Sequence, residues 1–265
     1  MNKALMIAMV ALAYGASAGD VLSGDAAKAK FPAAVQAMQL SETKWSQLMT
    51  GVEYGFTHAA DLYGVPDDLH VLKIDYANAP VKMKILEHSP NKMRTSEAAA
   101  AANALFAING TMYNTSVGKP IYNHKVDGRV VTPESGNLPT KVQGLAFNPD
   151  KSFDFSGTAT LTFADWDNII SCDCLLSKGV NMMDSPEFAW AKDTPGAGYP
   201  LIGMTPEKVL VILVIDGRRT GISQGINYFN SAELLKEFGC TEGILYDGGG
   251  STTLAMRNDI VPATD

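Results

Sequence analysis

The sequence predicts an α+β fold, with a mixed β-sheet core and packed helices in a single domain. Three observations predict it. Short runs of alternating apolar and polar residues are typical of half-buried strands, a continuous apolar run is typical of a strand buried on both faces, and helical segments lie between such runs. The chain has 265 residues, of which 46% are hydrophobic. That length and composition supply one sizeable core.

The N-terminus has the pattern of a secretory signal peptide. A polar, basic start at Asn2 and Lys3 precedes the apolar residues 4–13, and Ala16-Ser17-Ala18 offers the small residues of a cleavage site. The apolar run is too short to span a bilayer, and we expect no membrane span elsewhere. We therefore predict a periplasmic or secreted protein with three parts: a signal peptide at 1–18, an N-terminal lead-in at 19–69 and the main domain at 70–265.

Charge and cysteine usage limit the partners. A net charge of −7 argues against binding to nucleic acid or to an anionic membrane surface. In an oxidising compartment Cys240 could pair with Cys172 or Cys174, or all three could be buried structural thiols. The Cys172-x-Cys174 spacing is not a zinc pattern. We predict no metal and no cofactor, and the sequence does not indicate an oligomeric state.

The first half of the main domain predicts two strands, a helix and a third strand. Residues 71–76 and 81–86 alternate, with a turn signal between them, which favours an antiparallel pair with one wet face. Thr95 and Ser96 can cap an alanine-rich helix over residues 97–104. The apolar residues 105–108 then predict a buried strand that ends at a tight turn, Asn109-Gly110.

The middle of the chain predicts a long functional loop followed by strands. Residues 111–139 are rich in Asn, Gly and Pro, and such a segment inside a compact domain is more often functional than accidental. His124 and Glu134 lie in it and are interpreted as solvated. Residues 142–147, 153–155 and 159–163 have the composition of strands.

The last third predicts strand, helix, strand. Residues 209–215 form a continuous β-branched run. A helix capped at Asn230 ends at Gly239, and residues 243–246 form another short apolar run. If these two strands lie parallel in one sheet, they end at the same edge. Asp216 and Asp247 would then emerge together, each followed by glycine.

These residues suit a ligand that carries both hydroxyls and a negative charge. Two nearby carboxylates can divide acid and base roles. Glycines after an aspartate let the backbone approach a ligand and turn its N–H groups toward an anion. Arg218 offers a planar fork for phosphate, and Ser251 and Thr252 add hydroxyls. The set indicates a sugar phosphate.

The last third resembles the phosphodiester glycosidase family, through "VIDGRRTGISQGINYFNSAELLKEFGCTEGILYDGGGSTTLAM" and an earlier "AINGTMYN". The stretch 199–203 departs from the family pattern, because many relatives have an Arg there. Residues 172–176 also depart, where relatives often have Gly-Gly-Pro. The positions that match the family motifs are Asn109, Gly110, Asp216, Gly217, Arg218, Ser223, Gly225, Asp247, Gly248, Gly249, Gly250, Ser251 and Thr252.

The resemblance implies a catalytic domain that hydrolyses a sugar 1-phosphodiester and releases an N-acetylglucosamine-like sugar. Asp247 first, and Asp216 second, would protonate the leaving oxygen or activate water. Arg218 and the N–H groups of residues 248–251 would hold the phosphate, while Asn109 would orient a sugar hydroxyl. Gly110, Ser223 and Thr252 would also contact the substrate. Each residue also has a structural interpretation, such as a turn cap for Asp247 or an internal ion pair for Asp216. Two other functions stay open: a non-catalytic relative that binds cell-envelope glycans, and a metal-dependent phosphoesterase.

Overall fold

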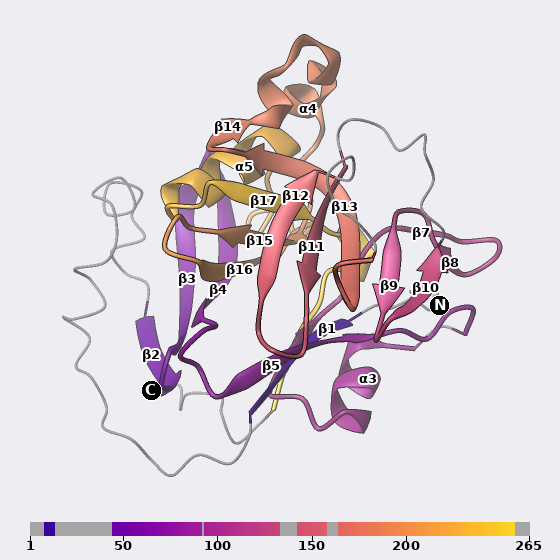
Figure 1. The fold of residues 1–265 in the computed structure, drawn as a ribbon. Helices are drawn as coiled ribbons and strands as arrows, with labels where there is room; N and C mark the ends of the chain where they lie inside the picture. Colours follow the sequence, from indigo (N-terminus) through magenta and orange to yellow (C-terminus); the bar gives the residue numbers. More distant parts are fainter. Residues whose placement is uncertain (1–7, 14–43, 92, 133–141, 158–163, 258–265) are drawn as a thin grey trace.

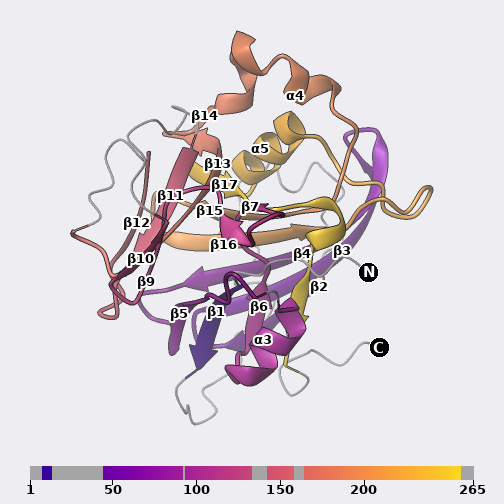
Figure 2. The same cartoon turned by 90° about the vertical axis from the view of Figure 1, so that its right-hand side faces the viewer.

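The computed structural model describes residues 8–13, 44–91, 93–132, 142–157 and 164–257. Two sheets pack face to face in this part of the chain (Figures 1 and 2). Helix α5 (Tyr228–Glu237) covers the outer face of the larger sheet, and helix α3 (Thr95–Ala101) covers the smaller one. The layers therefore run helix, sheet, sheet, helix.

Twelve of the described strands form the larger sheet, and every pairing in it is antiparallel. The main path runs β10-β9-β13-β17-β15-β16-β4-β3-β2, and β11, β12 and β14 extend it from β13. The bounds are β2 Lys44–Met49, β3 Val52–Leu62, β4 Val65–Asp75, β9 His124–Val126, β10 Arg129–Thr132, β11 Val142–Phe147, β12 Phe153–Gly157, β13 Asn168–Ser177, β14 Val180–Asn181, β15 Tyr199–Met204, β16 Val209–Ile215 and β17 Glu242–Leu245.

The smaller sheet has the order β18-β6-β1-β5. Its members are β1 Ala8–Ala13, β5 Val81–Leu86, β6 Phe106–Ile108 and β18 Leu254–Met256. Strand β1 lies within the predicted signal peptide and pairs with both β5 and β6. Cleavage after residue 18 stays a prediction. The remaining elements are β7 Tyr113–Asn114, β8 Lys119–Pro120, α4 Trp190–Asp193 and the 3₁₀ turns η2 Met182–Asp184, η3 Pro186–Phe188 and η4 Gly249–Ser251.

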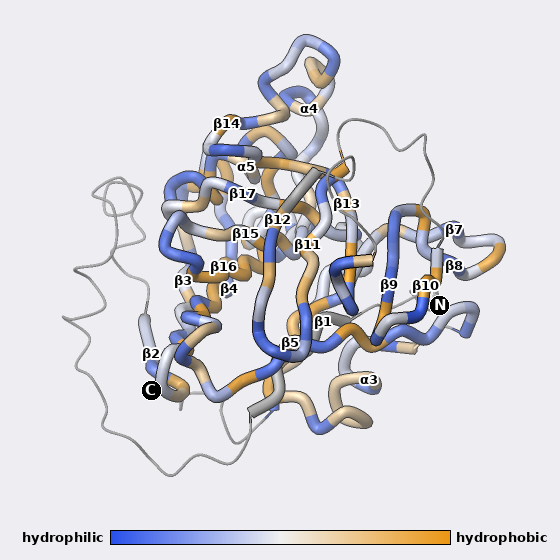
Figure 3. Tube along the Cα trace, in the orientation of Figure 1, coloured by the Kyte–Doolittle hydropathy of each residue, from blue (hydrophilic) through white to orange (hydrophobic). Residues whose placement is uncertain are grey.

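Two apolar cores lie on opposite faces of the larger sheet. Strand β16 contributes to both, as its continuous apolar sequence requires. Leu210, Ile212 and Val214 face the smaller sheet, whereas Leu213 and Ile215 pack toward α5. Figure 3 shows the apolar residues concentrated in these central strands. Because both faces are buried, the strand ends that carry the candidate site are rigidly placed.

The predicted strand, helix, strand unit in the last third is confirmed. Strand β15 lies between β16 and β17 and is antiparallel to each, so β16 and β17 run in the same direction. Helix α5 starts three residues earlier than predicted, because the side chain of Asn227 caps it by accepting from the N–H of Asn230 at 2.8 Å. Gly239 follows the helix with φ +80°, as a helix end requires.

Other predictions need correction. The expected mixed sheet has only antiparallel pairings among the described residues, and few helices pack on it. Strands β4 and β5 do not pair: β4 pairs with β3 and β16, and β5 joins the smaller sheet. His124 is buried rather than solvated, and its burial lowers its pKa to about 4. Residues 159–163 and Glu134 lie outside the described residues.

Two further features bear on the predicted organisation. Strands β2 and β3 lie within the predicted lead-in, yet both belong to the larger sheet, so that sheet begins before residue 70. Cys172, Cys174 and Cys240 are buried free thiols, and no disulfide joins them. Within the described ranges, no helix combines the length and apolar character needed to cross a membrane.

Candidate functional site

The two aspartates of the predicted site lie at the same edge of the larger sheet. Asp216 directly follows β16, and Asp247 follows β17 with Tyr246 between them. The backbone of Gly198 separates the loops that follow: Gly249 donates its N–H to the Gly198 carbonyl at 2.8 Å, and a Cβ on Gly217 would overlap the Gly198 nitrogen. We call residues 216–225 the Asp216 loop and residues 247–253 the Asp247 loop. The predicted convergence of the two motifs is therefore present.

Asp247 is half-buried and held by its neighbours. Its N–H donates to the carbonyl of Gly110 at 3.0 Å. Burial raises the pKa of its carboxyl above the usual range of aspartate, although hydrogen bonds from the Ser251 hydroxyl and the Gly248 N–H oppose that shift. A carboxyl in this setting can exchange a proton under milder conditions than an exposed one.

Asn109 fixes the Asp247 loop from the neighbouring sheet. Its side-chain amide donates to the Asp247 carbonyl at 2.6 Å, and its side-chain oxygen accepts from the N–H of Thr253 at 2.9 Å. Asn109 is buried. Both polar ends of the side chain are therefore used inside the protein. This geometry supports a positioning role for Asn109, and it does not support the predicted contact with a sugar hydroxyl.

The three glycines after Asp247 have different surroundings. A Cβ on Gly248 would overlap the ring of Tyr199, and Gly249 adopts φ +63° beside the Arg218 guanidinium. Gly250 faces open space. The N–H groups of Gly249, Ser251 and Thr252 already donate to backbone carbonyls, and the Thr252 hydroxyl donates to Gly198 at 2.8 Å. Most of the N–H groups predicted to cradle a phosphate are thus already hydrogen-bonded to carbonyls of the protein.

Arg218 contributes the cation that the site needs. It is exposed and has φ +61°, a left-handed conformation. This turn places its guanidinium against Gly249, where a Cβ would come within 2.5 Å of Nη2. Among the described residues, no carboxylate forms an ion pair with Arg218. Its charge is therefore available at the edge of the Asp247 loop.

Asp216 belongs to an exposed ionic network instead. Its Oδ1 accepts from the N–H of Gly217 at 2.8 Å, and its Oδ2 forms an ion pair with Arg219. The same guanidinium contacts Asp68 at 2.5 Å, and the Asp68 carboxylate also accepts a hydrogen bond from the Nδ1–H of His58 at 2.7 Å. The structural interpretation of the Asp-Gly-Arg turn, an internal ion pair, is the one that the contacts support.

Asp67 holds the Asp216 loop in place and was missed by the sequence reasoning. It is fully buried, and its Oδ1 accepts from the Ser223 hydroxyl at 3.0 Å and from the N–H of Gly225 at 2.7 Å. Burial raises its pKa to about 6. Ser223, predicted as a substrate contact, is a buried part of the loop and points to Asp67 instead. The only signal in the sequence was an aspartate at an inward-facing position of β4.

An aromatic pocket of 120 Å³ adjoins this edge of the sheet. Tyr122, Asp173, Trp190 and Tyr228 line it. The ring of Tyr228 lies 5.2 Å from that of Tyr199, the side chain that packs under Gly248. The pocket is therefore connected to the Asp247 loop through two neighbouring rings.

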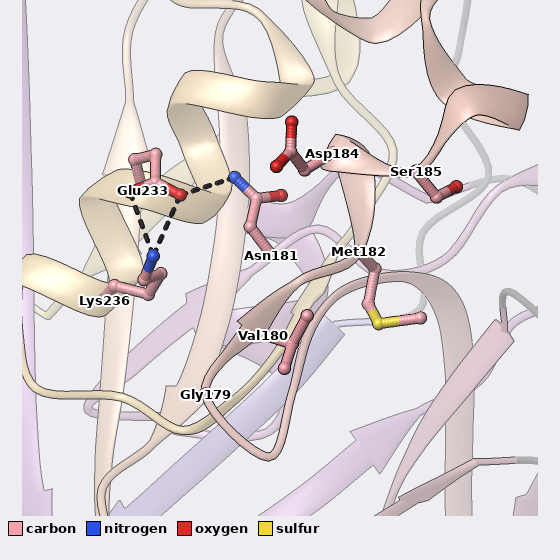
Figure 4. A pocket seen from close by; sticks show the side chains of 8 residues that line it. All are labelled: Gly179, Val180, Asn181, Met182, Asp184, Ser185, Glu233 and Lys236. Carbon is pink, nitrogen blue, oxygen red and sulfur yellow. Dashed lines mark hydrogen bonds and ion pairs between the residues drawn. The ribbon is translucent and has the colours of Figure 1, made fainter.

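A larger cavity of 470 Å³ lies elsewhere, between β14, η2 and the second half of α5. Figure 4 shows Glu233 joining Asn181 and Lys236 at its wall. None of the predicted site residues lines it. Within the described ranges, no three His, Cys, Asp or Glu side chains are grouped to hold a metal ion.

The fold and the site define a two-sheet protein with an acidic, arginine-flanked edge beside an aromatic pocket. Residues 102–264, more than half of the chain, match the model of the phosphodiester glycosidase family. The chain therefore belongs to this family, as its motifs predicted.

Solved structures confirm the fold. The chain is similar to the catalytic domain of zebrafish N-acetylglucosamine-1-phosphodiester alpha-N-acetylglucosaminidase, which that structure describes as auto-inhibited by its pro-peptide. The TM-score is 0.61 at 19% identity, with 92% of this chain and 87% of that chain covered. A hypothetical protein from Synechocystis matches with a TM-score of 0.56 at 11% identity, covering 81% of this chain and 59% of that one. A search of curated proteins gave no significant match.

Proposed function

We propose that this protein hydrolyses a sugar 1-phosphodiester and releases the sugar from its phosphate-linked partner. The observation that carries the proposal is that Asp247, a half-buried carboxyl just after a strand end, shares its loop with the guanidinium of Arg218, which forms no ion pair with a carboxylate of the described residues. Membership of the phosphodiester glycosidase family supports the same reaction class. Asp216 is already bound by Arg219, so the proposal now rests on Asp247.

In the proposed reaction the bond between the anomeric carbon and the phosphate oxygen breaks, and water supplies the new hydroxyl on the sugar. Arg218 offsets the charge of the departing phosphate through its planar fork. Asp247 delivers a proton to the leaving oxygen or accepts one from the attacking water, which a carboxyl with a raised pKa is suited to do. Asn109 holds the Asp247 loop in place during the reaction.

The test uses the purified protein and aryl phosphodiesters of several sugars in ¹⁸O-labelled water. Glycosidic cleavage puts the label on the anomeric carbon of the free sugar and leaves an unlabelled aryl phosphate. Cleavage at phosphorus would put the label on the phosphate instead, either in a sugar phosphate released together with phenol or in an aryl phosphate released together with unlabelled sugar, and either result would contradict the proposal. The same assay with a chelator tests the metal-dependent alternative, which predicts that the chelator abolishes activity.

A protein that binds these sugars without forming product would be a glycan-binding relative instead. The stretch 199–203 has Tyr199 but no Arg, and such a result would make that departure the feature to explain.

A further inference from the structure

The aromatic pocket beside the Asp247 loop is built from separate elements that converge. Asp173 comes from β13, Trp190 from α4 and Tyr228 from the start of α5. Trp190 is half exposed, and its ring meets that of Tyr228 at 5.3 Å with the planes at 71°. The pocket therefore presents a large aromatic surface that solvent can reach.

The pocket is mostly apolar with one charged group. Val142, Met183 and Phe188 complete the lining. The Asp173 carboxyl accepts a hydrogen bond from the Tyr122 hydroxyl at 2.8 Å, and in the described part of the chain no Lys or Arg forms an ion pair with it. A half-buried carboxylate with one donor has acceptor capacity left for a ligand. Few, well-placed polar groups in an apolar pocket are typical of small-molecule sites.

Strand pairing and ring contacts place this pocket beside the Asp247 loop. Asp173 lies opposite Leu245, the last residue of β17, and Asp247 follows two residues later. The ring of Tyr228, which lines the pocket, lies 5.2 Å from the ring of Tyr199, and Tyr199 packs against Gly248. The pocket and the proposed reacting group are therefore neighbours.

We infer that this pocket holds the sugar ring of the substrate, and that Asp173 makes the site selective for neutral or amino sugars over sugar acids. This inference rests on the proposed function. Trp190 and Tyr228 contact the apolar C–H face of the ring, and Asp173 accepts a hydrogen bond from a ring hydroxyl or an amide N–H. A sugar acid would bring a second carboxylate against Asp173, and two like charges in a half-buried pocket repel each other.

The first experiment measures binding of free sugars to the full chain by ligand-observed NMR. The probes are glucose, N-acetylglucosamine and glucuronic acid, at a pH high enough to ionise both the sugar acid and Asp173, whose pKa burial raises. We expect the two neutral sugars to bind and glucuronic acid to bind about tenfold more weakly. Trp190→Ala should weaken the neutral sugars about tenfold, because it removes the aromatic surface. Asp173→Asn should narrow the gap between glucose and glucuronic acid.

Matched variants keep this test specific. Trp190→Phe preserves an aromatic ring and should bind within about threefold of the wild type. Trp45→Phe changes a tryptophan on β2, far along the sheet path from β13, and should have no effect. The inference is overturned if no sugar binds the wild type, if Trp190→Ala and Asp173→Asn bind as the wild type does, or if glucuronic acid binds as well as glucose.

Kinetics then separate this inference from the proposed reaction. If sugars bind through Trp190 and Asp173 but no phosphodiester is hydrolysed, the pocket assignment is supported and the proposed reaction is contradicted. If hydrolysis proceeds and both variants keep the wild-type KM and sugar preference, the proposed reaction is supported and the pocket assignment is contradicted.

Discussion

The Asp247 loop and the Asp216 loop begin alike and end in different environments. Each is an Asp-Gly step after a buried strand, and both leave the same edge of the sheet. The Asp247 loop is held by backbone groups of Gly110 and Gly198 and by the buried amide of Asn109. The Asp216 loop is exposed over residues 218–222, and the Asp216 side chain is 39% exposed and ion-paired with Arg219.

This difference teaches that burial and partners, rather than the motif, decide what an aspartate can do. Burial raises the pKa of Asp247, and among the described residues no cation is ion-paired with it. Asp216 has the guanidinium of Arg219 as its partner, so its carboxylate is already engaged in an ion pair. We therefore expect the two loops to respond differently to the same chemical change.

The largest expected effect is that of Asp247→Asn. Asparagine keeps the shape of the side chain and removes its ability to exchange a proton. If the proposed function holds, kcat should fall by about 10²–10⁴-fold, while the melting temperature changes little because the main-chain contacts of the loop remain. Steady-state kinetics beside a thermal melt check this. Turnover at the wild-type rate would show that Asp247 takes no part in the reaction and that the two loops do not differ in this respect.

The comparison also explains what the sequence could and could not predict. Local sequence signals mark three elements: the continuous apolar run of β16, the helix that begins at an N-cap and ends before Gly239, and the short apolar run of β17. Together they placed Asp216 and Asp247 at one edge. Strand β15 inserts between β16 and β17 and makes each pairing antiparallel, which no local pattern reveals.

Side-chain partners were harder to predict than positions. Asn109 and Ser223 match family motifs, but their polar groups bind other parts of the protein. Asp67 and Asp173 are important in the structure, and each comes from a strand that packs against the site over a long sequence separation. Spacing along the chain carries no information about such contacts, because tertiary packing alone brings them together.

The second prediction is that protein stability depends on pH through Asp67, the buried carboxyl that holds the Asp216 loop. Burial raises the pKa of Asp67 to about 6, against about 3.9 in an unfolded chain. The folded state therefore binds this proton more tightly. Its contribution to stability is fully present below about pH 4 and is lost as the pH rises through about 6, a change of about 3 kcal/mol at most.

Asp67→Asn should flatten this part of the pH profile. Asparagine keeps an oxygen that can accept from Ser223 and Gly225 but carries no ionisable proton. Urea unfolding across the range from acid to neutral pH measures the slope for the variant and the wild type. An unchanged slope in the variant would mean that another group causes the decline, and that the Asp216 loop does not depend on a titrating support.

A third prediction contrasts two glycines of the Asp247 loop. Gly248→Ala places a methyl group against the Tyr199 ring and the Gly198 carbonyl. We expect a loss of about 1–3 kcal/mol in stability, because neither neighbour can move freely. Gly250→Ala is the matched control: its methyl group meets open space, so stability should change little. Denaturant unfolding of both variants measures the difference, and equal effects would contradict the tight backbone packing that distinguishes this loop.

The smallest expected effect is that of Asp216→Asn or Arg219→Gln. Exposed ion pairs contribute little to stability and are screened by salt, so we expect each variant to melt close to the wild type. If the proposed function holds, kcat/KM should fall by less than about tenfold, because the carboxylate positions a loop and does not exchange the proton of the reaction. Measuring both variants at low and high salt should show the small difference shrinking as salt is added. A loss for Asp216→Asn as large as that for Asp247→Asn, independent of salt, would make Asp216 the second catalytic carboxylate that its motif first suggested, and the ion pair with Arg219 would then have to open during turnover.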